Sequence, residues 1–164
     1  MSSTLTGVKA LETLLKAMPD RVAKKVVVGG LRAGARIIVA KAKANIRANP
    51  SIDSGLLLSK VGSGVRKGAG PGTAAVHVGV RGGAAIVKRR GKKKPEKAVA
   101  SRYAHLVEFG TKNMKAEPFL RPALDEGGDE AIRKIGQTMG KGVEREARAL
   151  ASGKTSFLTG KRIR

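Results

Sequence analysis

The sequence has no cysteine and no tryptophan, and only four of its 164 residues are aromatic. Without cysteine the chain can form no disulfide, no thiolate metal site and no cysteine nucleophile. No apolar run approaches the roughly 18 residues of a membrane span, and the N-terminus lacks the apolar core of a signal peptide. We therefore expect no membrane contact, and a core that packs around the few rings it has.

Acidic residues are also scarce, because 12 aspartates and glutamates face 34 lysines and arginines, for a net charge of +22. The excess is uneven, since residues 1–95 hold 20 of the bases but only three of the acids. Such a balance indicates a polyanionic partner, most simply nucleic acid. The alternative is a surface whose charge serves only solubility.

The residue constellations of enzymes are missing as well. The segment Gly153-Lys154-Thr155 resembles a phosphate loop, but that motif needs glycine where Arg148 stands. No Gly-x-Ser-x-Gly elbow is present. His105 and Glu108 are three residues apart, yet the only other histidine is His77, so a metal site would need carboxylates from distant segments. The sequence predicts no enzyme activity, no cofactor and no metal.

Two long helices are predicted. The first runs from 20 to 49, where Asn49-Pro50 stops it, and its glycines at 29, 30 and 34 favour close approach of another backbone or a kink. Its apolar or small positions follow a period of 3.6, at Val22, Val26, Gly30, Ala33, Ile37, Ala40 and Ala44. The second helix is predicted over 122–150. Its apolar stripe is Leu124, Ala131, Ile132, Ile135, Met139, Val143, Ala147 and Leu150.

Short strands are predicted between these helices. Residues 56–65 and 74–80 form a hairpin with a long glycine-rich tip, and 84–88 form a third strand. The segment 88–94 carries six cations in seven residues, which predicts a loop. Contacts to DNA phosphates or to an acidic partner are predicted for Arg32, Arg36, Lys43, Lys88, Arg89, Arg90, Lys92, Lys93 and Lys94.

The predicted fold class is α+β, with a small antiparallel β-sheet and a long hairpin packed against two long α-helices. We expect an N-terminal helix or arm over 1–18, one domain over 19–150 and a basic C-terminal tail over 151–164.

Three of the four rings lie in the stretch 103–124, which we take as the centre of the fold. Tyr103, Leu106 and Phe109 are spaced by three, so the period leaves a strand and a helical turn both open. A polar loop follows, and Pro122 then suits the first turn of a helix. We expect the rings before and after the loop to meet in one cluster.

This stretch carries a resemblance. Tyr-Ala-His-x-Val-Glu-Phe-Gly-Thr, a short basic loop, and then Pro-Phe-Leu-Arg-Pro-Ala-Leu is similar to the signature of neck or tail-completion proteins, the minor tail components of long-tailed bacteriophages. The resemblance covers roughly residues 20–150. It implies a structural virion protein, made in the host cytoplasm, that forms a homo-oligomeric ring (a hexamer or dodecamer) at the head–tail junction. Its implied neighbours are head-completion or connector proteins and tail-tube or tail-terminator proteins, with double-stranded DNA passing nonspecifically through the channel.

The residues that match the signature are expected to hold the fold or the contact between subunits. They are Tyr103, His105, Glu108, Phe109, Gly110, Thr111, Pro118, Phe119, Arg121 and Pro122. Glu108 and Arg121 are candidates for a salt bridge, the alternative being two separate surface charges of little energetic value. The competing hypothesis for the whole chain is a sequence-nonspecific nucleic-acid-binding protein of histone-like or ribosomal type.

Overall fold

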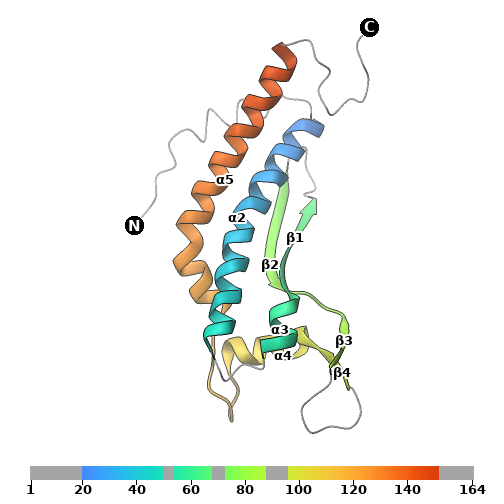
Figure 1. Ribbon diagram of the computed structural model, residues 1–164, viewed down its shortest axis with the longest axis vertical. Helices are drawn as coiled ribbons and strands as arrows, with labels where there is room; N and C mark the ends of the chain where they lie inside the picture. Colours follow the sequence, from blue (N-terminus) through green and yellow to red (C-terminus); the bar gives the residue numbers. More distant parts are fainter. Residues whose placement is uncertain (1–19, 50–53, 68–72, 88–95, 152–164) are drawn as a thin grey trace. The chain divides into compact units, whose positions relative to one another are not determined.

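The structure is a computed structural model that describes residues 20–49, 54–67, 73–87 and 96–151 (Figure 1). Its elements, in chain order, are α2 (Asp20–Ala48), α3 (Ser54–Lys60), β1 (Val61–Lys67), β2 (Ala74–Val80), β3 (Ala84–Val87), β4 (Glu96–Val99), α4 (Ala100–Phe109) and α5 (Leu120–Ala151). Two long helices and two small two-stranded sheets confirm the predicted α+β class. The predicted N-terminal helix, the hairpin tip, the cation-rich loop and the basic tail lie outside the described residues.

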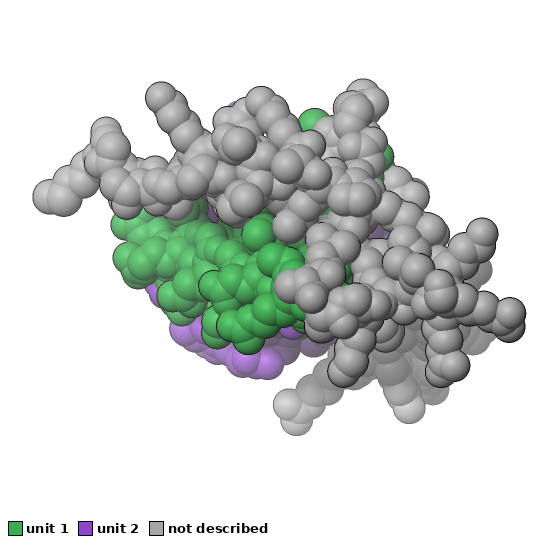
Figure 2. Space-filling model, turned by 90° about the horizontal axis from the view of Figure 1, so that it is seen from above, with its two compact units in different colours: residues 1–35, 65–77, 129–164 green, residues 36–64, 78–128 purple. Residues whose placement is uncertain are grey.

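By its contacts the chain divides into two compact units, coloured green and purple in Figure 2. Unit 1 comprises residues 1–35, 65–77 and 129–164, and unit 2 comprises 36–64 and 78–128. The predicted domain boundaries, near residues 18 and 150, stay a prediction.

In unit 1, the first part of α2 packs closely against the second part of α5. A β-carbon added to Gly34 would lie 2.6 Å from Ile135 Cγ1 and 2.9 Å from the carbonyl oxygen of Ala131, and one added to Gly30 would collide with Met139. A β-carbon on Gly142 would lie 3.1 Å from Val26. The close approach predicted from the glycine spacing is therefore confirmed.

The buried face of α2 differs from the predicted stripe. Its buried residues include a row spaced by four, at Val26, Gly30, Gly34, Ile38, Ala42 and Ile46. Because four residues exceed one turn of 3.6, this row winds around the helix. The prediction of a straight stripe was therefore wrong at Ala40 and Ala44, which are exposed, whereas Ala33 and Ile37 are half-buried.

The stripe predicted for α5 needs the same correction. Leu124, Ile132 and Ala147 are exposed, while Ala123 and Gly127 are buried. The small residues lie inward because α2 comes close: a β-carbon on Gly127 would lie 3.0 Å from Ile38 Cδ1 in unit 2. Hydrophobicity alone places the larger side chains inside, so a close helix contact lined by small residues escapes it.

The glycine contact in unit 1 predicts that two glycine-to-alanine substitutions in α2 change the free energy of unfolding in opposite directions. Glycine to alanine in a helix normally stabilises by about 1 kcal/mol. Gly29→Ala should show about that gain, because nothing lies within 4 Å of its added β-carbon. Gly34→Ala should instead lower the free energy of unfolding by about 2 kcal/mol, because the backbone of Ala131 cannot yield as a side chain can. Urea denaturation of both variants tests this, and a gain from Gly34→Ala would contradict the close approach.

In unit 2, the segment predicted as the start of a strand is helical. Residues 56–60 belong to α3, in which Leu57 is fully buried. A short continuous apolar run fits a buried strand and a buried helical turn equally, which explains the error. Strand β2 is confirmed, with Val76, Val78 and Val80 half-buried and His77 exposed.

The strands form two separate pairs. Strand β1 neighbours β2, and at the base of this pair the N–H of Arg81 donates to the carbonyl of Lys60 at 2.9 Å. Strand β3 confirms the third predicted strand and pairs antiparallel with β4, Ala84 opposite Val99. Strand β4 was not predicted, because four mixed residues after the basic segment show too little alternation.

The core of unit 2 centres on one ring. Phe119, Ile46 and Leu57 are the largest fully buried side chains among the described residues. The side-chain amide of Asn45 donates to the carbonyl of Phe119 at 3.2 Å, which ties α2 to the start of α5. Phe109, by contrast, is 61% exposed, so the prediction that the rings on both sides of the loop share one cluster was wrong for Phe109.

Candidate assembly surface at the α4–α5 junction

The first half of the central stretch is a helix. In α4 the buried residues Ala100, Ala104 and Glu108 are spaced by four, which identifies the face turned to the core. The helix ends at Gly110, whose N–H donates to the carbonyl of Leu106 at 2.8 Å. Gly110 has φ 75° and ψ −179°, a conformation open almost only to glycine.

The carboxylate of Glu108 holds the start of α5. One of its oxygens, Oε2, accepts the backbone N–H groups of Phe119 at 2.9 Å and Leu120 at 3.0 Å, and Oε1 accepts that of Arg121 at 3.0 Å. The first N–H groups of a helix have no partner within it, and the helix dipole favours a negative charge there. Glu108 is only 6% exposed, so it satisfies three donors that water would otherwise reach poorly.

The predicted salt bridge between Glu108 and Arg121 takes a different form. The carboxylate meets Arg121 through its backbone N–H, not through its guanidinium. The guanidinium carbon instead lies 4.7 Å from the centre of the Phe109 ring, within the range of a cation–π contact. Arg121 therefore stabilises the position of an exposed ring, and that ring covers one side of the charged group.

The loop between the two helices is tied by backbone hydrogen bonds. Thr111 and Met114 exchange bonds of 2.9 and 3.3 Å across a tight turn, and the N–H of Asn113 donates to the Thr111 hydroxyl at 3.3 Å. The N–H of Glu117 donates to the carbonyl of Val107 at 2.8 Å, which returns the chain to α4. The loop thus has a defined shape although its residues from 111 to 116 are exposed.

Four large apolar side chains are exposed at this junction. We call the surface formed by Leu106, Phe109, Met114, Arg121 and Leu124 the junction face. Leu106 is 37% exposed, Met114 43% and Leu124 59%, beside the 61% of Phe109. Leu106 lies one turn from Phe109 on α4, and Leu124 lies one turn from Arg121 on α5, so the contact between Phe109 and Arg121 connects them.

The exposed charges of α4 and of the loop are positive, whereas Asp125 and Glu126, which follow Leu124 on α5, are exposed acids. Arg102, on α4, and Lys112 and Lys115, on the loop, are exposed. Between residues 100 and 119 the only acids are Glu108, which is buried, and Glu117, which is half-buried. The face therefore combines apolar side chains with cations, a combination enriched in protein–protein contacts when the cation is arginine.

The structure sorts the predicted signature residues into two groups. Buried or half-buried are Tyr103, Glu108, Gly110, Phe119 and Pro122. Exposed are His105, Phe109, Thr111, Pro118 and Arg121. The first group lies in or at the edge of the core, and the second lies on the surface. The sequence did not identify Leu106, Met114 and Leu124 as surface residues, because an exposed apolar residue cannot be told from a core residue by its type.

The predicted basic residues of α2 lie on its outer surface in part. Arg32, in unit 1, and Arg36, in unit 2, are exposed, whereas Lys43 is half-buried. Arg47, which was not predicted, is exposed, and its spacing of 11 from Arg36 and 4 from Lys43 places all three on one face. No acid occurs between residues 21 and 49. The predicted cations from 88 to 94 lie outside the described residues.

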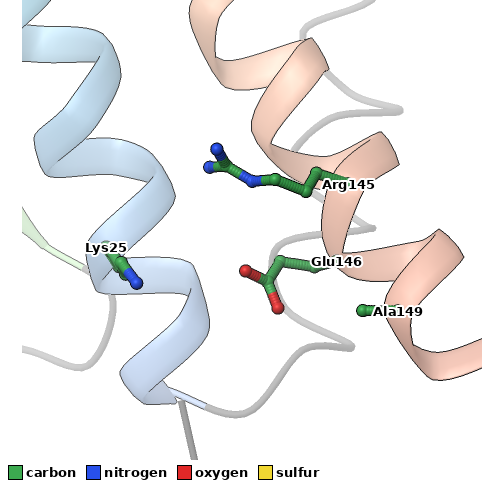
Figure 3. A pocket seen from close by; sticks show the side chains of 4 residues that line it. All are labelled: Lys25, Arg145, Glu146 and Ala149. Carbon is green, nitrogen blue, oxygen red and sulfur yellow. The ribbon is translucent and has the colours of Figure 1, made fainter. Parts of the chain in front are cut away.

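A pocket in unit 1 is the second candidate site (Figure 3). It has a volume of about 320 Å³ and is lined by Lys25 on α2 and by Arg145, Glu146 and Ala149 on α5. Glu146 is 6% exposed and points toward α2. In the sequence, its burial was indicated by its spacing of three from Val143, a residue of the predicted apolar stripe. Its described lining residues include no serine, threonine or cysteine that could act as a nucleophile. Among the described residues, no group of three histidine, aspartate or glutamate side chains suits a metal.

Comparison with known proteins adds one match. Residues 9–110, more than half of the chain, match the family described as "Bacteriophage HK97-gp10, putative tail-component". The matched segment ends at Gly110, so it contains the first part of the signature and not Phe119 or Arg121. No curated protein and no solved structure matches the chain. Within the described ranges, no helix is long and apolar enough to cross a membrane.

Proposed function

Because the chain belongs to the HK97-gp10-like family of bacteriophage tail components, we propose that it forms a homo-oligomeric ring at the head–tail junction. As a tail component it belongs to the virion and contacts other virion proteins. Its role there is structural: it joins the neck to the tail and leaves a channel for double-stranded DNA. Head-completion or connector proteins and tail-tube or tail-terminator proteins are its proposed neighbours.

The structural observation that supports assembly into a virion is the construction of the junction face. The buried signature residues use their hydrogen bonds to fix the start of α5 against α4. The exposed ones hold Phe109 outward under the guanidinium of Arg121. An ordered exposed ring at a rigid helix junction is what an assembly contact needs, because little side-chain freedom is lost on binding.

DNA is proposed as a nonspecific partner of the basic face of α2. Arg36, Lys43 and Arg47 share one side of the helix, and no acid interrupts it. Cations without interleaved rings suit phosphates and not bases, so binding should be insensitive to sequence and weakened by salt. The same face supports the competing function, a nucleic-acid-binding protein of histone-like or ribosomal type.

Light scattering after size-exclusion chromatography separates these functions. Nuclease-treated protein at 0.1 and 0.5 M salt should elute as a closed oligomer at both concentrations, and negative-stain images of the peak should show rings. The DNA-binding function predicts instead a single subunit that binds any duplex with a steep salt dependence. A monomer at both salt concentrations with tight DNA binding would contradict the proposal.

A further inference from the structure

We propose that the junction face is the docking site for another virion protein, through a segment in which apolar side chains are flanked by carboxylates. The inference rests on the proposed function in one respect, that the chain is built into a virion. It adds the chemistry of the partner and the residues that select it. The centre of the site is Phe109 with Arg121, and Leu106, Met114 and Leu124 form its apolar border.

The face is organised before any partner arrives. Phe109 is the last residue of α4, and the next residue, Gly110, turns the chain away with its bond to Leu106. The base of Arg121 is fixed because its backbone N–H is held by Glu108, one residue before the same ring. Both members of the cation–π pair thus stand on hydrogen-bonded backbone, and their contact at 4.7 Å restricts the ring. Phenylalanine, methionine and arginine are residue types enriched at such contacts.

The charges select the partner. The exposed cations Arg102, Lys112 and Lys115 have no exposed acid among them on α4 or on the loop, while Arg121, on α5, has Asp125 four residues after it. An apolar segment with carboxylates at its ends would cover the ring and meet these cations, which is electrostatic complementarity. Two copies of this chain facing each other through the same surface would bring these cations together.

A second copy has one other way to occupy the face. Asp125 and Glu126 are the first exposed carboxylates of α5 and follow Leu124 directly. A neighbouring copy that used this segment would supply the same chemistry. These carboxylates lie about one turn from Arg121 on the same helix, so a copy that used them would bring its own Arg121 toward the cations of the face. A different, acidic protein is therefore the favoured occupant, and binding of a second copy at this face would overturn the inference.

The test uses the full chain as bait for a displayed library of random 12-residue peptides, in 0.15 M salt. We expect the enriched peptides to combine aspartate or glutamate with aromatic or aliphatic residues. Synthetic peptides made from the enriched sequences should bind Phe109→Ser and Arg121→Ser at least tenfold more weakly than wild type. The triple variant Arg36→Gln, Lys43→Gln, Arg47→Gln, which lowers positive charge elsewhere, should change their binding less than threefold. Circular dichroism confirms that each variant is folded.

Every other result overturns the inference. Absence of enrichment, enrichment of acidic peptides without apolar residues, or equal binding to Phe109→Ser would remove the docking site. Displacement of the peptides by single-stranded oligothymidylate with the same dependence on Phe109 would make the face a nucleic-acid site. Loss of the oligomer in Phe109→Ser would make it a contact between copies. The proposed function fails separately, when wild-type protein forms no ring.

Discussion

Replacing Glu108 with alanine should lower the free energy of unfolding by about 4 kcal/mol. The substitution removes the acceptor of three backbone N–H bonds at 2.9–3.0 Å and leaves the buried N–H of Phe119 without a partner. A hydrogen bond to a charged group contributes about 1.5–3 kcal/mol, and a buried unsatisfied donor costs about 1–3 kcal/mol. Water entering the vacated space recovers part of the sum. Urea denaturation followed by circular dichroism measures the loss.

Two further variants separate the charge from the shape. Glu108→Gln keeps the volume and one acceptor oxygen, so it should lose about half as much as alanine does. Glu144→Ala removes an exposed carboxylate from α5 and should change stability by less than about 0.5 kcal/mol. If Glu108→Ala were no more damaging than Glu144→Ala, the carboxylate would not hold the start of α5.

Replacing Gly110 with alanine should cost about 3 kcal/mol. At φ 75° and ψ −179° the backbone is strained for any residue with a β-carbon, which accounts for about 1–3 kcal/mol. The new β-carbon would also lie 2.8 Å from the amide nitrogen of Ala116 and from the carbonyl oxygen of Met114. Both are backbone atoms of the tied loop, so neither can rotate away. The same urea titration gives the measurement.

A second glycine distinguishes strain from crowding. Gly83 also has a positive φ, 106°, but nothing lies within 4 Å of an added β-carbon. Gly83→Ala should therefore show the strain alone, about 1 kcal/mol. Equal losses at the two positions would mean that the loop relaxes around the β-carbon added at Gly110 and is less firmly tied than its hydrogen bonds indicate.

Much of the fold was predictable because it depends on local pattern. The two long helices follow sustained periodicity, and Asn49-Pro50 marks the end of α2. The strand 74–80 alternates valine with small or polar residues and was found within its bounds. What failed was the phase of the helices. The buried rows are set by glycines that lie against the other long helix. A hydrophobicity pattern does not assign glycine to the buried face, because glycine has no apolar side chain.

The sequence located the candidate site, but it did not predict which groups its residues contact. The signature located the junction, yet Glu108 looked like the partner of a side chain, because nothing in the sequence marks a carboxylate that binds backbone 11–13 residues later. Helix caps are normally sought at the residue before the helix. Phe109 was expected in the core, because a chain with only four aromatic residues is expected to bury them. It is instead on the surface.

The contact between α2 and α5 in unit 1 also prevents one helix from sliding along the other. A row spaced by four residues can in principle step along its partner by one ridge and meet the same geometry again. Here the sizes forbid the step. Gly30 faces Met139, while Val26 faces Gly142. The larger side chain of the facing pair therefore belongs to α5 at the first contact and to α2 at the second, about one turn away. Shifting α2 by four residues would drive Val26 onto Met139, and the pair is left with one alignment.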